Sequence, residues 1–79
     1  MENIIRRALA DVLNIENISE ISQQDNLENV GLDSINFVML IVTLEDVLDI
    51  QISENKLEYK NFQTIEKILK VIEEQIYGE

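Results

Sequence analysis

Apolar residues recur at helical spacing in three separate stretches of the chain. In the first stretch, residues 2 to 14, they return every three or four positions, as they do on one face of an α-helix. These residues are Ile4, Ile5, Ala8, Leu9, Val12 and Leu13. The polar side of the same stretch carries Arg6, Arg7 and Asp11. The last stretch begins at Thr64 and ends at Gly78, and its apolar face consists of Ile65, Ile68, Leu69, Ile72 and Ile76. Each stretch therefore predicts an amphipathic helix with one face in a core.

The middle stretch, residues 34 to 48, is the most apolar and has apolar positions on two sides. It contains neither Gly nor Pro, so about four uninterrupted turns are expected. The side expected to face the core consists of Phe37, Leu40, Ile41, Leu44, Val47 and Leu48. The opposite side is an apolar strip that consists of Ile35, Val38, Met39 and Val42. Toward the end of the helix this side continues into Glu45, Asp46 and Asp49.

The acids on the second side indicate that the apolar strip is exposed, because carboxylates are rarely buried without a partner. The alternative is a central helix buried on both sides, and Val38 fits either arrangement. An exposed apolar strip edged with acids is typical of a docking surface. The pattern therefore favours a helix with one face in the core and one face available to a partner.

The residues before the middle helix indicate where it begins. Gly31 can adopt backbone angles that other residues avoid, and Asp33 is a good N-cap, so the helix is expected to start at Ser34. A phosphate ester on Ser34 would be favoured by the first-turn amides and the helix dipole. Asp33 would repel that phosphate unless a divalent cation bridged the two groups. The alternative is that Ser34 is an ordinary first-turn residue.

The connections complete an all-α prediction. Residues 15 to 33 form a long first loop, and loops of this length are uncommon unless they are functional or held to the core. The residues expected to hold it are Ile15, Ile18, Ile21, Leu27, Val30 and Leu32. After an irregular segment, a short helix is expected from Ser53 to Leu57, with Tyr59 and Phe62 filling the space beneath it. The prediction is a small four-helix bundle of three long helices and one short helix, in a single domain over residues 1–79.

The composition excludes several kinds of chemistry. The 79 residues contain no cysteine and no histidine, so the chain lacks a thiolate nucleophile and the usual general base. Asp33 is a poor base for the Ser34 hydroxyl because it is engaged as an N-cap. A calcium loop over residues 25 to 36 is rejected, because Leu27 and Val30 stand where a ligand and a glycine are required. We therefore expect no autonomous catalysis and no metal site.

Charge is unevenly placed along the chain. The formal net charge is −10, and residues 8 to 55 contain ten acids and no Lys or Arg. Such a surface repels nucleic acid and anionic lipid and attracts basic patches on partner proteins. The start of the chain lacks the features of a signal peptide, and no segment has membrane-spanning length. A monomeric, cytoplasmic protein is expected.

The segment Gly31-Leu32-Asp33-Ser34-Ile35, followed by a helix that ends in Glu45-Asp46, resembles the acyl carrier protein family, also called phosphopantetheine-binding or thiolation domains. The resemblance covers essentially the whole chain, including the long first loop and Phe62-Gln63-Thr64-Ile65 at the entry to the last helix. Asp-Ser-Ile alone is a weak motif. At the start of the second helix of a short acidic chain it is specific.

The resemblance implies that Ser34 is the attachment serine. A separate phosphopantetheinyl transferase would move 4′-phosphopantetheine from coenzyme A onto Ser34 using magnesium, with Asp33 near the transferase's metal. The thiol of the arm would then carry an acyl or aminoacyl group as a thioester between a loading enzyme and synthase or condensing enzymes. The residues implied in docking these partners are Ile35, Val38, Met39, Val42, Glu45, Asp46 and Asp49.

The chain departs from fatty-acid carriers early in the second helix. Those carriers typically have acids where this chain has Asn36 and Met39. The more apolar strip resembles discrete carriers of polyketide or nonribosomal peptide pathways, and a fatty acid biosynthesis carrier is the alternative. A remote alternative is an unmodified acidic helical adaptor. Both termini fall close to predicted helices, which favours a freestanding carrier.

Overall fold

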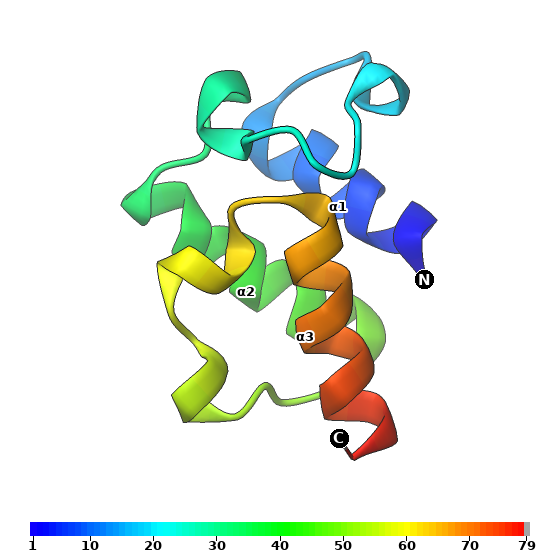
Figure 1. Ribbon diagram of the computed structural model, residues 1–79, viewed down its shortest axis with the longest axis vertical. Coiled ribbons are helices and arrows are strands. Elements are labelled where there is room, and N and C mark those ends of the chain that lie inside the picture. The colour runs from blue at the N-terminus through cyan, green and yellow to red at the C-terminus, as the bar shows by residue number, and fades with distance from the viewer. Residues whose placement is uncertain (79) are drawn as a thin grey trace.

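Three α-helices and four short 3-10 turns make up the fold of the computed structural model, which describes residues 1–78 (Figure 1). The α-helices are α1 (Glu2–Leu13), α2 (Ser34–Leu48) and α3 (Ile65–Tyr77). The 3-10 turns are η1 (Ile18–Glu20), η2 (Leu27–Val30), η3 (Glu54–Lys56) and η4 (Tyr59–Phe62). Residues 1–78 contain no β-strand. The predicted all-α fold is confirmed, and α2 has the predicted bounds.

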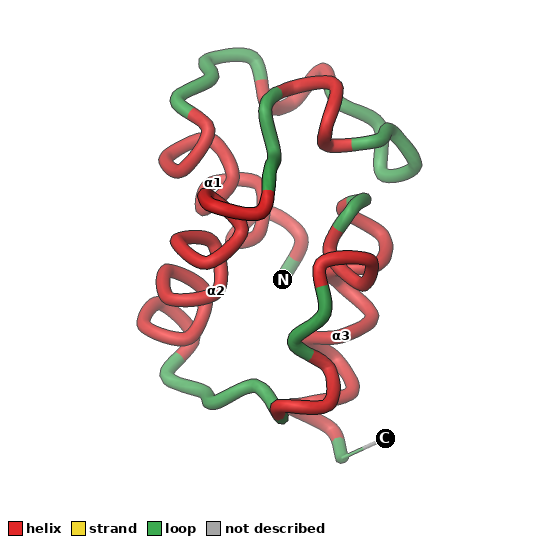
Figure 2. The backbone as a smooth tube through the Cα atoms, turned by 90° about the vertical axis from the view of Figure 1, so that its left-hand side faces the viewer, coloured by secondary structure: helices red, strands yellow, loops and turns green. Residues whose placement is uncertain are grey.

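The helices are arranged around α1 and η4. α1 packs against both α2 and α3, which stand on opposite sides of the view in Figure 2, and η4 also contacts both of these helices. Phe62 of η4 is fully buried and belongs to the core that the helices share. The short helical turn expected from Ser53 to Leu57 is present as η3, a single 3-10 turn with Ser53 as its N-cap residue, and η4 is a further 3-10 turn that was not predicted. None of the helices in residues 1–78 combines the length and apolar character needed to span a membrane.

One continuous core lies between the helices. Its members from α2 are Leu40, Ile41 and Leu44, with Phe37 and Leu48 partly buried against them. α1 contributes Ile5, Ala8 and Leu9, and α3 contributes Ile65, Ile68, Val71 and Ile72. The core face of α2 is therefore assigned correctly for these five residues.

Three residues predicted for core faces are exposed instead. Val47 is 57% exposed because it lies about 60° around the helix axis from Leu44, at the margin of the buried face. There it lines a shallow hollow with Ile4, which is 36% exposed. Ile76 is 39% exposed because the last turn of α3 extends beyond the other helices (Figure 1). Helical spacing therefore identified the buried faces correctly but also assigned to them residues at their margins that are exposed.

Arg6 holds the long first loop against α1. Its Nη1 atom donates to the carbonyl oxygens of Ile18 and Ile21, both at 2.7 Å, and its Nε atom lies 2.8 Å from Glu2 Oε2. The Arg6 side chain is only 16% exposed, so the expectation that it faces solvent with Arg7 and Asp11 is wrong. The hydrogen bonds from Arg6 and Gln23 lower the pKa of Glu2. Arg6 thus ties two carbonyls of the first loop to α1.

The second half of the first loop is bound to the start of α3. The Leu27 amide donates to the Gln63 carbonyl at 2.8 Å, and the Glu66 amide donates to the Gln23 carbonyl at 3.1 Å. Ile21, Leu27 and Leu32 are buried in the core, as expected of residues that hold the loop. The loop therefore reaches the start of α2 as an ordered part of the domain.

The assignment of the two faces of α2 predicts unequal effects of two substitutions to alanine. Leu44 is fully buried, so Leu44→Ala should lower the free energy of unfolding by about 2 to 5 kcal/mol. Val42 lies on the same helix and is 55% exposed, so Val42→Ala should change it by less than about 0.5 kcal/mol. Urea denaturation followed by circular dichroism measures both. Equal losses for the two variants would contradict the assignment.

Candidate functional site

Reciprocal hydrogen bonds between Asp33 and Asn36 fix the first turn of α2. Asp33 Oδ1 accepts from the backbone amides of Ile35 and Asn36, both at 2.9 Å. Asn36 Oδ1 accepts from the backbone amide of Asp33 at 2.8 Å, which completes a capping box. This confirms that Asp33 is the N-cap and that α2 begins at Ser34. Asn36, whose capping role was not predicted, is part of the cap.

The turn before the cap depends on Gly31. Gly31 has a φ of 114° and ends η2, with its amide donating back to carbonyls of that turn. A Cβ atom at this position would meet nothing within 4 Å, so the backbone angle, not space, requires glycine. Asn36 Nδ2 donates to the Gly31 carbonyl at 2.8 Å. The Asn36 amide therefore holds both the turn and the cap.

Ser34 is exposed at the first position of α2. Within residues 1–78 its hydroxyl makes no hydrogen bond. Two amides of the first turn already donate to Asp33. A phosphate at Ser34 would therefore be stabilised by the helix dipole more than by hydrogen bonds from free amides. The hydroxyl is thus accessible to another macromolecule.

Tyr59 connects η4 to the turn that precedes Ser34. Its hydroxyl lies 2.8 Å from Glu28 Oε2 and 3.2 Å from the Leu32 carbonyl oxygen. Its ring packs edge-on against Phe37, with centroids 5.6 Å apart, and Phe37 also contacts Phe62 at 5.2 Å. Partial burial, together with the hydrogen bond to Glu28 and the charges of Glu28 and Asp33, raises the pKa of Tyr59 to about 12.

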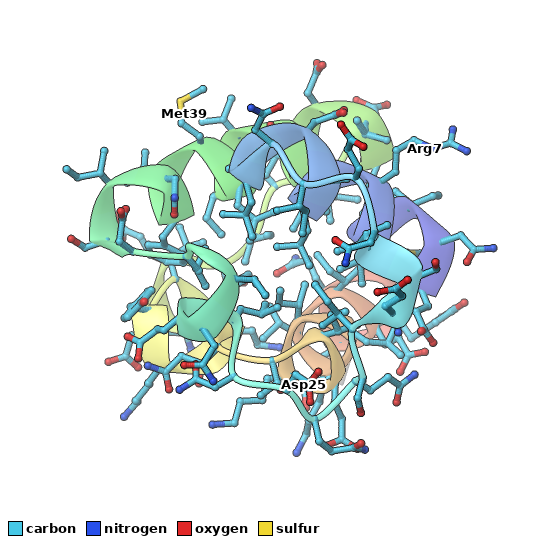
Figure 3. All side chains as sticks on the ribbon, turned by 90° about the horizontal axis from the view of Figure 1, so that it is seen from above. Arg7, Asp25 and Met39 are labelled. Atoms are coloured by element: carbon cyan, nitrogen blue, oxygen red, sulfur yellow. The ribbon has the colours of Figure 1, made fainter. Side chains whose placement is uncertain are left out.

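The apolar strip of α2 is exposed along its length. The exposed fraction is 80% for Ile35, 56% for Val38, 56% for Met39 and 55% for Val42. Met39 extends away from the body of the molecule (Figure 3). The alternative in which α2 is buried on both sides, which Val38 also fitted, is therefore wrong. Isolated exposed apolar residues are common, but four on one helix face form a contiguous patch.

The three acids beyond the apolar strip differ in their surroundings. Asp46 and Asp49 are exposed, and Asp49 ends α2 in the left-handed conformation with φ 53°. Glu45 is half-buried, and its Oε2 atom accepts from the Ile52 amide at 2.8 Å. Glu45 therefore holds the connection after α2, a role that the sequence pattern did not indicate. Asp46 and Asp49 remain the acids free to face a partner.

The comparison with protein families agrees with this geometry. A family model described as "Phosphopantetheine attachment site" matches residues 3–72, from the first turn of α1 into α3. The chain belongs to this family. Members of the family carry a covalently attached 4′-phosphopantetheine, so the chain is a phosphopantetheine-carrying carrier protein. Carrier domains are non-catalytic and work with a phosphopantetheinyl transferase and partner enzymes.

The side chains of the carrier protein fit the group that the family carries. An exposed hydroxyl at a helix N-terminus suits a phosphodiester, and the apolar strip begins one residue further along. The arm supplies a thiol, which the chain itself lacks. Within residues 1–78 no three acidic side chains gather in a group that could hold a metal ion.

The raised pKa of Tyr59 predicts a loss of stability at alkaline pH. The folded protein favours the protonated phenol, so the contribution of Tyr59 is complete below its ordinary pKa of 10.0 and is lost as the pH rises through about 12. In Tyr77→Phe, Tyr59 is the remaining tyrosine, and its ionisation can be followed by tyrosinate absorbance. Glu28→Gln should lower the pH of that transition. A transition unchanged by Glu28→Gln would contradict the role of Glu28.

Proposed function

We propose that this chain is an acyl or aminoacyl carrier protein in which Ser34 is the attachment residue for 4′-phosphopantetheine. The observation that carries the proposal is the exposed Ser34 hydroxyl at the capped start of α2, next to an exposed apolar strip. Asp33 accepts two backbone hydrogen bonds and is not aligned as a base for Ser34. Proton removal is therefore assigned to the transferase.

In the proposed attachment, Ser34 Oγ forms a bond to the phosphorus of coenzyme A that bears the pantetheine. The bond from that phosphorus to the adenosine bisphosphate portion breaks, and the hydroxyl proton passes to a base on the transferase. Asp33 lies beside the new phosphodiester, where magnesium on the transferase would offset the repulsion between the two negative charges. The chain contributes a fixed, accessible hydroxyl and no catalytic group.

The apolar strip and the exposed acids are proposed to dock partner enzymes. Ile35, Val38, Met39 and Val42 would contact an apolar surface, while Asp46 and Asp49 would pair with basic residues at its edge. Glu45 contributes negative charge, although its carboxylate also bonds to Ile52.

The pathway is proposed from the early part of α2. Asn36 and Met39 replace the acids that fatty-acid carriers typically have there, and Asn36 serves the cap. This favours a carrier of a polyketide or nonribosomal peptide pathway over one of fatty acid biosynthesis.

Attachment at Ser34 is tested by mass spectrometry of the intact protein. Incubation with coenzyme A, magnesium and a broad-specificity phosphopantetheinyl transferase should add one phosphopantetheine to the wild-type chain. Ser34→Ala should abolish the addition because the accepting oxygen is gone. Ser53→Ala, at another exposed serine, is the matched control and should accept the group normally.

Modification of Ser34→Ala at the wild-type level would remove Ser34 from the proposal. An unmodified wild-type chain that still binds a basic partner would instead favour the helical adaptor. That adaptor also predicts partner binding that survives Ser34→Ala and weakens with added salt.

The role of the exposed acids predicts a position-dependent effect of charge reversal. Asp46→Lys should slow the reaction of the modified carrier with a basic partner enzyme by about three- to tenfold, because it removes attraction at the docking edge. Glu73→Lys makes the same change of net charge on the exposed side of α3 and should have little effect. Single-turnover kinetics at low salt measure both, and equal rates for the two variants would contradict docking through α2. Neither should alter the melting temperature appreciably, since exposed charges contribute little to stability.

A further inference from the structure

We propose that Tyr59 is a positioning residue for modification of Ser34, acting through the peptide group between Leu32 and Asp33. This inference rests on the proposed attachment at Ser34. Tyr59 lies 25 residues further along the chain and does not contact the Ser34 hydroxyl. Its effect is on the backbone that leads into α2.

The peptide group between Leu32 and Asp33 is held at both ends by side chains. Its carbonyl oxygen lies 3.2 Å from Tyr59 Oη, and its N–H donates to Asn36 Oδ1 at 2.8 Å. Because a peptide group is planar, fixing the carbonyl and the N–H fixes the orientation of the whole unit. The next residue is the N-cap, so this orientation determines the direction in which α2 starts and Ser34 is presented.

The Tyr59 hydroxyl also joins the two arms of the Gly31 turn. It bonds to Glu28 before the glycine and to Leu32 after it. A phenol has one proton, so two acceptors within reach make this a shared hydrogen bond. The ring is held in place by the edge-on contact with Phe37. The packing of the Tyr59 ring on Phe37 therefore fixes where its hydroxyl lies relative to the turn.

The other hydrogen bonds of this turn are local. The amides of Gly31 and Leu32 bond within residues 27 to 32, and Asn36 bonds to Gly31 and Asp33. Within residues 1–78, Tyr59 is the one residue distant in sequence that makes a hydrogen bond to residues 28–34. Removing its hydroxyl should leave the local bonds in place while allowing the Leu32–Asp33 peptide group to reorient.

Tyr59→Phe tests the inference because it removes the hydroxyl and keeps the ring that packs on Phe37. In phosphopantetheine transfer, KM for the Tyr59→Phe carrier should rise by about three- to tenfold, the factor that corresponds to one ordinary hydrogen bond. The substitution lowers only the fraction of carrier molecules in which the start of α2 is correctly oriented. Molecules that are correctly oriented react as before, so the kcat value should change little. Tyr77→Phe, at the exposed tyrosine of α3, is the matched control and should keep the wild-type KM.

Glu28→Gln keeps an acceptor oxygen for Tyr59 and should retain a KM near that of wild type. In the unmodified protein, hydrogen exchange of the Asp33 amide should be faster in Tyr59→Phe than in wild type and unchanged in Tyr77→Phe. A lower melting temperature with unchanged KM and unchanged Asp33 exchange would overturn the positioning role.

The two proposals fail in different ways. A wild-type chain that accepts no phosphopantetheine overturns both the attachment at Ser34 and the inference that rests on it. A wild-type chain that is modified, with Tyr59→Phe modified at the same KM, overturns only the role of Tyr59.

Discussion

The start of α2 depends on two hydrogen bonds made by the amide side chain of Asn36. Its oxygen accepts from the Asp33 amide and its nitrogen donates to the Gly31 carbonyl, both at 2.8 Å. An aspartate at this position could accept but, when ionised, could not donate, so the bond to Gly31 would be lost. A residue that is both donor and acceptor therefore joins the glycine turn to the helix cap. The position of Ser34 follows from this connection.

The exposure of one side of α2 follows from how the small core is built. α1 and η4 contact α2 on its buried side, and the core is completed by α3 and by residues of the first loop. Residues 1–78 offer no further element to cover Ile35, Val38, Met39 and Val42. The same helix thus supplies core contacts through Leu40 and Leu44 and a free apolar surface through the strip.

Features that depend on local chemistry could be predicted from the sequence. Gly31 and Asp33 act on their neighbours, so the start of α2 at Ser34 was predicted to the residue. The exposure of the strip was also predictable, because Asp46 and Asp49 share its face. The burial of Ile21, Leu27 and Leu32 followed from the length of the loop that they hold.

Features that depend on residues distant in sequence could not be predicted in the same way. Arg6 has the helical position of an exposed residue, and only the loop carbonyls of Ile18 and Ile21 explain its burial. Glu45 continues the strip by spacing, yet its carboxylate bonds to the Ile52 amide. Tyr59 was expected as a space-filling aromatic, and its hydrogen bonds to Glu28 and Leu32 depend on where η4 packs.

These distant contacts share a physical cause in the size of the chain. A domain of this length buries a small core, so its long connections cannot be held by apolar contacts alone. The carbonyls of the first loop are paired with Arg6, the connection after α2 with Glu45, and the turn before Ser34 with Tyr59. Each of these side chains supplies a hydrogen bond to backbone that lies outside the α-helices. The turn before the proposed attachment residue, Ser34, is thus ordered by the phenol of Tyr59 and the amide of Asn36.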